Sequence, residues 1–392
     1  MSSTTPAIPA ARPVHVLLNT PHLDLMGGVA NFYRMLRPHL SANVDYFIVG
    51  ERPGESGRLD RLRRFVRDYL DFLRQLRNGY DLVHLNPSLG SKAVIRDGMF
   101  LLLAKLLGKK VMVFMHGWDR GCEHRLRRYF MPLFRAVYFR ADAFVVLCSE
   151  FKSNLIDMGY RGPVFTETTA VGDQTLAAAK GVLTKPPSAA NRGFNILFLS
   201  RLERPKGVYE ALQAYRLLKV RHPEATLTIA GHGSELEPLK ACVRDQGLEG
   251  VIFTGYVRGA DKQRVFSSAQ AFCLPSYGEG MPIAVLEAMA FGLPIVTRPV
   301  GGLRDLIEEG RTGFLIEGLD PELFADRLEQ LLMDPALRRC MAQHNHQYAR
   351  NHFAAPQVAA RIEGIYRDVA SSQAASHAPR SSRGFSRRIP EG

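Results

Sequence analysis

Short apolar segments alternate with longer amphipathic segments along most of this 392-residue chain, and this alternation constrains its fold most strongly. The apolar runs suit buried strands, and the stretches between them have helical spacing. Strands that alternate with helices form parallel sheets covered on both faces, so the pattern predicts an α/β protein. We expect strands at residues 14–19, 46–49, 82–85, 111–115, 143–147, 195–199, 226–230, 251–254, 271–274 and 295–297.

The alternation is interrupted once, near the middle of the chain. Residues 184–192 are rich in Pro, Ala and polar types, which is typical of a linker. The same pattern restarts after it, so we expect two doubly wound α/β domains, over residues 1–185 and 186–350. Residues 371–392 lack periodicity, which predicts a disordered basic tail.

Positive charge gathers in the first of these domains. Residues 1–150 hold 22 Lys and Arg against 13 Asp and Glu, whereas the remainder is almost balanced. This asymmetry suggests an anionic partner for the first domain, or only a solvated basic surface, and no zinc-finger, RNP or KH-type signature indicates nucleic acid. No apolar run is long enough to span a membrane, and no leader-like segment opens the chain. Five scattered cysteines fit a reducing cytosol and no structural zinc site, so we expect a cytoplasmic protein.

Two basic segments of the first domain are also amphipathic. Residues 52–77 contain eight arginines and four acids, and residues 120–140 contain six arginines and one acid. Both carry apolar residues at nearly helical spacing, as an interfacial helix does. One reading is binding to the cytosolic face of an anionic membrane, which would place the acceptor on a lipid carrier. The other reading is that these apolar faces pack on the sheet.

Ligands of doubly wound sheets bind beyond the carboxyl ends of the strands, so the loops there deserve close reading. Gly27 and Gly28 follow the first strand and open a helix whose N–H groups could meet a phosphate, although a plain tight turn fits them too. Arg201 and Lys206 follow the first strand of the second domain. Two cations at that position can converge on a diphosphate, or form an exposed basic turn.

A third loop carries carboxylates. Glu279 lies at its end, and Glu287 follows inside the otherwise apolar stretch 283–290. A carboxylate in such a helix costs stability unless it is hydrogen-bonded. A hydroxyl-rich ligand is one partner for Glu287, and other protein groups are the alternative.

These motifs together resemble the GT-B retaining glycosyltransferases of glycosyltransferase family 4. The resemblance is continuous from Phe198 to about Leu315, through the Arg201…Lys206 pair and two glutamates separated by seven residues. The first half is similar more loosely, through Gly27-Gly28 and His116-Gly117. The family fold implies two Rossmann-like domains facing a central cleft, with a C-terminal helix at 351–370 packing back on the first domain.

The resemblance also implies roles for the matching residues. Arg201 and Lys206 would grip the donor diphosphate, Glu287 the ribose, and Glu279 the sugar. His116 would project into the cleft beside the reacting carbon, although a His before Gly is more often structural. The expected catalytic residues are His116, Glu279, Arg201 and Lys206. The expected donor-binding residues are Gly27, Gly28, Arg201, Lys206, Gly231, Tyr256, Val257, Glu279, Gly280, Met281 and Glu287.

The implied activity is metal-independent transfer of a sugar, with retention, from a UDP- or GDP-sugar to a hydroxyl of a glycan or lipid-linked glycan. We expect no cofactor and no bound metal, since no Asp-x-Asp pair occurs in the chain to hold a divalent cation on the diphosphate. Pro282 follows Met281 where the family often has Phe-Gly, so one backbone donor is absent and the sugar stays open. A sugar-nucleotide epimerase and a non-catalytic scaffold remain as alternatives. An NAD-linked oxidoreductase is disfavoured because no G-x-G-x-x-G follows the first strand.

Overall fold

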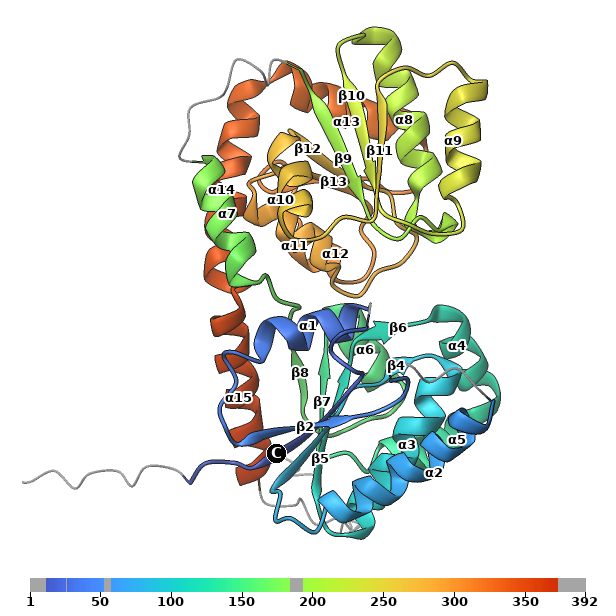
Figure 1. Ribbon diagram of the computed structural model, residues 1–392, viewed down its shortest axis with the longest axis vertical. Helices are drawn as coiled ribbons and strands as arrows, with labels where there is room; N and C mark the ends of the chain where they lie inside the picture. The colour runs from blue at the N-terminus through green and yellow to red at the C-terminus, as the bar shows by residue number, and fades with distance from the viewer. Residues whose placement is uncertain (1–11, 26, 53–57, 184–192, 373–392) are drawn as a thin grey trace, which may run out of the picture.

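The computed structural model describes residues 12–25, 27–52, 58–183 and 193–372. The expected linker at 184–192 and nearly all of the expected tail at 371–392 lie outside these ranges. Two six-stranded parallel sheets stand one above the other in Figure 1, each within its own layer of helices. The prediction of an α/β protein with two doubly wound domains is confirmed.

The first sheet has the strand order β2-β1-β3-β5-β7-β8. Its strands are β1 (Val16–Thr20), β2 (Val44–Ile48), β3 (Leu82–Leu85), β5 (Lys110–Met115), β7 (Ala143–Val146) and β8 (Val164–Thr166). Its helices are α1 (Gly28–Leu36), α2 (Arg58–Gln75), α3 (Ser91–Leu106), α4 (Arg120–Arg125), α5 (Met131–Tyr138) and α6 (Ser149–Asp157), with a π-helical turn, η1 (Leu126–Phe130), before α5. A two-residue ladder, β4 (Ser88–Leu89) with β6 (Gly117–Trp118), extends the loops after β3 and β5.

The second sheet repeats this plan with the order β11-β10-β9-β12-β13-β14. Its strands are β9 (Asn195–Leu199), β10 (Thr226–Ala230), β11 (Val251–Gly255), β12 (Ala271–Leu274), β13 (Ile295–Thr297) and β14 (Gly313–Leu315). Its helices are α8 (Val208–Arg221), α9 (Leu236–Asp245), α10 (Gly259–Ser268), α11 (Ile283–Ala290), α12 (Gly302–Leu306) and α13 (Pro321–Met333). The order reverses between β1 and β3 in the first sheet and between β9 and β12 in the second, and ligands of such sheets bind at these reversals.

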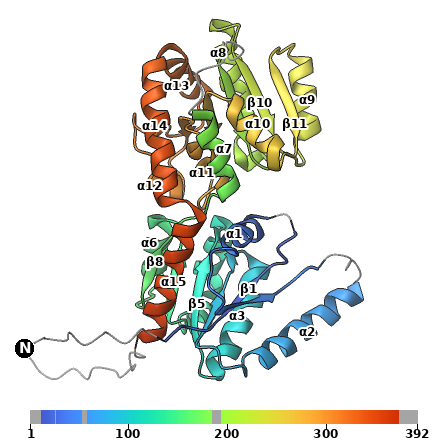
Figure 2. The same ribbon diagram turned by 60° about the vertical axis from the view of Figure 1, so that its left-hand side comes forward.

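The chain crosses between the domains twice, before α7 (Asp173–Leu183) and between α14 (Pro335–His352) and α15 (Ala355–Ser371), and Figure 2 shows these three helices. α7 falls in the range expected for the first domain, but its buried Ala179 packs in the core of the second. The chain therefore changes domain before α7, earlier than the predicted linker. α14 starts at an Asp-Pro pair, in which Asp334 accepts two backbone N–H groups. α15 returns to the first domain, where its Ile362 and Tyr366 are buried in the core.

The two domains also touch directly beside the sheet edges. Asp305 of α12 accepts hydrogen bonds from the backbone N–H (2.6 Å) and hydroxyl (2.5 Å) of Ser149, at the start of α6. Glu150 of α6 accepts in turn from the N–H of Gly301, just before α12, at 3.2 Å. Each helix thus receives a carboxylate at its N-terminus from the other domain, which suits the direction of both helix dipoles.

Candidate active site

The loops after β9 and β12 meet at the strand-order reversal of the second domain. Lys206 lies in a 3₁₀ turn, η3 (Arg204–Lys206), and its Nζ donates to Glu279 Oε1 at 2.7 Å. The two side chains are only 17% and 8% exposed, so this is a partly buried ion pair. Gly207 makes the approach of the loops possible, because its φ is 74° and a Cβ there would lie 2.1 Å from the carbonyl oxygen of Pro275.

Arg201 does not join this pair. Its side chain is 71% exposed and donates to Glu203 Oε1 at 2.7 Å. The structure therefore brings together Lys206 and Glu279, and leaves Arg201 at the rim of the same loop.

Glu287 lies on α11 and is 3% exposed. Lys262 of α10 places its Nζ 2.5 Å from Glu287 Oε2. Burial raises the pKa of the Glu287 carboxyl, and the Lys262 ammonium opposes that rise. Among the described residues none gives this shielded Oε2 a well-oriented hydrogen bond, so the contact with Lys262 is an ion pair.

The loop after β11 reaches the same neighbourhood through α10. Tyr256 is 61% exposed and Val257 is half-buried directly before α10 begins. Since α10 also carries Lys262, these two expected donor-binding residues lie in the loop before the helix that contacts Glu287. Sequence reasoning missed Lys262, and its only signal was a cation one helical turn into α10.

Gly231, by contrast, has a packing role in the described structure. Its φ is 147°, and a Cβ there would lie 1.9 Å from the carbonyl oxygen of Ser200. It therefore holds the loop after β10 against the loop that carries Arg201.

The Glu279 loop continues towards the first domain. A Cβ on Gly280 would lie 3.3 Å from the carbonyl oxygen of His116 and 2.9 Å from Leu147. Among the described residues, none accepts a hydrogen bond from the N–H of Gly280 or of Met281. Pro282 is the residue before α11, so the missing N–H falls directly after these two donors.

Gly27 and Gly28 form the open N-terminus of α1. A Cβ on either would meet no atom within 4 Å, so packing does not demand glycine there. Among the described residues no side chain caps this helix, so its first N–H groups are available for an anion.

His116 directly follows β5 and lies over the ring of Phe114, with centroids 4.0 Å apart. Burial lowers the pKa of His116 to about 3, so the ring is neutral at physiological pH. His84, on the neighbouring strand β3, is fully buried and burial lowers its pKa well below the usual value. Neither histidine can serve as a proton donor near pH 7.

These two histidines predict acid sensitivity of the fold. Unfolding exposes both rings and returns their pKa to the ordinary value of 6.5. Below that pH the unfolded chain binds a proton at each histidine, and the folded protein does not. Stability therefore falls as pH drops below about 6.5, by about 1.4 kcal/mol per pH unit for each histidine. Urea titrations from pH 8 to pH 5 measure this slope. His116→Gln should reduce it and substitution of the exposed His124 should not; a midpoint independent of pH would contradict the assignment.

Comparisons with known proteins bear on the family and the fold of the chain. The model for "Glycosyl transferase 4-like domain" matches residues 10–166, and the model for "Glycosyl transferases group 1" matches residues 183–348. A D-inositol 3-phosphate glycosyltransferase of Arthrobacter sp. (strain FB24) is 36% identical over 170 residues, which cover 41% of this chain and 40% of the relative. A glycogen synthase of Mycobacterium tuberculosis is 31% identical over 206 residues, which cover 52% and 49%.

The chain thus spans about half the length of these curated relatives. The solved structure of HepE from Anabaena in complex with UDP-glucose has a TM-score of 0.68 at 16% identity, covering 90% of this chain and 99% of that one. At this identity the likeness concerns the fold. With a family model on each of its two Rossmann-like domains, the chain belongs to the GT-B glycosyltransferases of the group 1, glycosyltransferase 4-like family.

Proposed function

We propose that this chain is a retaining, metal-independent glycosyltransferase that uses a UDP- or GDP-sugar. The Lys206–Glu279 pair carries the proposal. A cation and a carboxylate, both largely shielded, lie at a strand-order reversal and next to the loop that reaches His116. Such a pair can open to place the cation on a diphosphate and the carboxylate near the sugar. The family models that match the two domains support sugar transfer as the chemistry.

In this proposal the bond between the anomeric carbon and the diphosphate oxygen breaks, and its electron pair goes to the diphosphate. Lys206 neutralises the growing charge, helped by Arg201 and by the N-terminus of α1. The acceptor hydroxyl attacks from the same face, and its proton passes to the departing phosphate oxygen. His116 stays neutral throughout, because its pKa is about 3. Contact between the domains would exclude water from the reaction.

Nucleotide release from a panel of UDP- and GDP-sugars tests this proposal. We expect one donor to be consumed with a suitable glycan acceptor, and the rate to persist in EDTA, because protein cations neutralise the diphosphate. Loss of activity in EDTA that only a divalent ion restores would contradict the metal-independent site. Among the described residues, no group of three or more His, Cys, Asp or Glu side chains is arranged to hold a metal ion.

The acceptor side of the proposal concerns a surface of the first domain that we call the apolar face. Its residues lie on neighbouring elements, α2, α3, η1 and α5, and are 45% to 71% exposed. They are Phe65, Val66, Leu70, Ile95, Met99, Tyr129, Phe130 and Leu133. The packing reading is confirmed for part of these helices, since Phe72 and Phe134 are buried in the core of the first domain. Membrane binding stays a proposal for the exposed residues.

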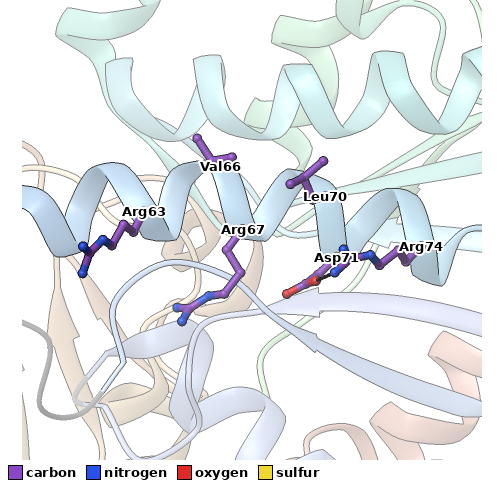
Figure 3. Close-up of a pocket in the computed structure, with 6 residues that line it drawn as sticks. All are labelled: Arg63, Val66, Arg67, Leu70, Asp71 and Arg74. Carbon is purple, nitrogen blue, oxygen red and sulfur yellow. Dashed lines mark hydrogen bonds and ion pairs between the residues drawn. The ribbon is translucent and has the colours of Figure 1, made fainter.

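Arginines border the apolar face. Figure 3 shows Arg63, Arg67 and Arg74 along α2 beside Val66 and Leu70, and these five residues with Asp71 line a shallow groove of about 410 Å³. Apolar side chains flanked by cations suit the headgroup region of an anionic bilayer. We therefore place the acceptor on a lipid-linked glycan, as in cell-surface polysaccharide or glycolipid synthesis. No helix within the described residues could itself span a membrane.

Vesicle co-sedimentation tests the apolar face. The full chain should bind vesicles that contain phosphatidylglycerol and not neutral ones, and salt should weaken the binding. The double variant Val66→Ser, Leu70→Ser should lose most of it. Val220→Ser is the matched control, because Val220 is 81% exposed on α8 of the other domain. Equal recovery on neutral vesicles, or no difference between the variants, would favour a soluble acceptor.

A further inference from the structure

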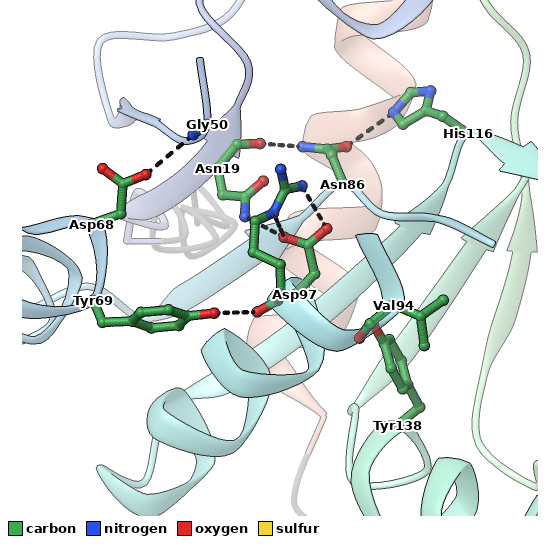
Figure 4. A network of polar contacts seen from close by, with 10 residues as sticks. Asn19, Gly50, Asp68, Tyr69, Asn86, Val94, Asp97, His116 and Tyr138 are labelled. Atoms are coloured by element: carbon green, nitrogen blue, oxygen red, sulfur yellow. Dashed lines mark hydrogen bonds and ion pairs between the residues drawn. The ribbon is translucent and has the colours of Figure 1, made fainter. Parts of the chain in front are cut away.

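A chain of buried polar groups lies beneath His116 in the first domain. Asn86, in the turn after β3, has its Oδ1 2.9 Å from His116 Nε2 and 2.6 Å from the hydroxyl of Tyr33 on α1. Tyr33 and Asn86 are 0% and 5% exposed. Figure 4 shows Asn86 between His116 and Asn19. Buried polar groups of this kind are paired, so the directions of their bonds can be worked out.

The amide of Asn86 can have only one orientation. Its Nδ2 lies 2.6 Å from the carbonyl oxygen of Asn19, an atom that can only accept. Oδ1 is therefore the atom that faces His116, and an amide oxygen also only accepts. Consequently Nε2 of His116 must carry its proton. With the ring neutral, Nδ1 then has none.

The other arm of the network agrees with this orientation. The hydroxyl proton of Tyr33 is committed to Asn86 Oδ1, so at 3.2 Å Tyr33 accepts from Nε2–H of His84. This leaves Nδ1 of His84 to accept from the hydroxyl of Tyr366, 2.7 Å away on α15. Each hydroxyl and each ring N–H of the network thus meets one acceptor. Turning the Asn86 amide over would set its NH₂ against His116 and an oxygen against the Asn19 carbonyl.

The free end of the network is His116 Nδ1. Among the described residues none bonds to this atom, and it is not one of the shielded unpaired polar atoms. His116 is also the residue whose backbone carbonyl oxygen lies next to Gly280 of the second domain. A bare ring nitrogen there can accept from a hydroxyl, and it repels phosphate oxygens.

We propose that Asn86 is a positioning residue that holds His116 as the Nε2–H tautomer, so that Nδ1 is a permanent hydrogen-bond acceptor for a substrate hydroxyl. Which hydroxyl bonds to Nδ1 rests on the proposed function, since the donor sugar and the acceptor each carry hydroxyl groups. The tautomer itself does not depend on that function. Tyr33 and His84 support the orientation of Asn86 from behind and never touch substrate.

Nitrogen and carbon NMR of histidine-labelled full-length protein tests the tautomer without any substrate. The signals of His116 are identified by their loss in His116→Gln. We expect a protonated Nε2 and a bare Nδ1 in the unaltered chain from pH 5.5 to pH 8. A proton on Nδ1 would overturn the proposal, whether or not the protein proves to transfer sugar.

Asn86→Asp provides the second readout. A carboxylate keeps the bond to Nε2–H but stabilises the imidazolium, so His116 should now titrate above pH 6. The titratable groups packed around it are Tyr33 on α1 and His84 on β3. Protonation of Nδ1 abolishes the acceptor, so the ratio of variant to unaltered kcat should fall about tenfold between pH 8 and pH 6, with little change in donor KM.

Asn345→Asp is the matched control, because Asn345 is another buried asparagine that donates to backbone carbonyls, in the second domain. It should lose stability without any change at His116. If His116 in Asn86→Asp showed no titration between pH 5.5 and pH 8, Asn86 would not set its protonation. Should Asn86→Asp fail to fold, the tautomer of the unaltered protein still decides. Deoxy analogues of the donor sugar and of the acceptor show which of the two supplies the hydroxyl that bonds to Nδ1.

Discussion

Lys206→Ala is expected to lower kcat by a factor of 10² to 10³, with a much smaller change in donor KM. Removing one preorganised donor of charge stabilisation costs about 2.7–4 kcal/mol in the transition state. Lys206 matches that description, because it is 17% exposed and held by Glu279 at the sheet edge before any diphosphate arrives. Steady-state rates of nucleotide release measure the effect.

The substitution also leaves Glu279 without its partner, so the variant's thermal midpoint must be measured beside its rate. Lys240→Ala is the control in the same domain, since that lysine forms a more exposed pair with Glu237 on α9. It should keep both the rate and the midpoint. A Lys206→Ala protein that is folded and turns over within threefold of the unaltered chain would contradict the role given to the pair.

Substitution of Glu287 should change nucleotide binding, and substitution of Glu279 should change turnover. Glu287→Gln is expected to weaken nucleotide binding about tenfold or more, as loss of a hydrogen bond to a charged group does. Glu279→Gln should chiefly lower kcat, because contacts near the sugar strengthen as charge develops. Trp118 provides the binding signal: it is the only tryptophan in the chain, lies two residues after His116, and stacks on Phe151 with centroids 5.0 Å apart.

Glu329→Gln is a suitable control for these variants, because Glu329 lies on the far helix α13 and pairs there with Arg221 and His222 at the end of α8. Its fluorescence titration should match that of the unaltered chain. Identical changes in donor affinity for Glu279→Gln and Glu287→Gln, with kcat unaffected in both, would show that Glu279 acts in the ground state only.

The sequence predicted the strands well where apolar runs are continuous, because burial on both faces of a parallel sheet demands them. All ten expected strands are present, with ends shifted by at most two residues. β8 and β14 were missed, since each has three residues and β8 is a half-exposed edge strand. The end of the first domain was placed too late, because a Pro-rich stretch signals a loop and not which core the preceding helix joins.

The sequence pointed to single candidate residues of the site, but not to the residues that they contact. Lys206 and Glu279 stand out as charged residues in loops after predicted strands, and Glu287 as a carboxylate inside an apolar stretch; their roles stay predictions. The ion pair between Lys206 and Glu279 joins residues 73 apart, and Asn86 lies 30 residues from His116. Contacts over such separations depend on strand order and loop packing, which no local pattern contains. Arg201 illustrates the same limit, because its sequence position predicts a diphosphate contact while its side chain donates to Glu203.

Proton NMR of the products tests the central claim, sugar transfer with retention at the Lys206–Glu279 site, most directly. The donor found in the nucleotide-sugar panel is followed in EDTA with its acceptor, and the anomeric signals of donor and product are compared. The account predicts release of the nucleoside diphosphate together with a glycoside of the donor's own configuration, and no product from Lys206→Ala within the same time. A product of inverted configuration, or equal product from the variant, would contradict it.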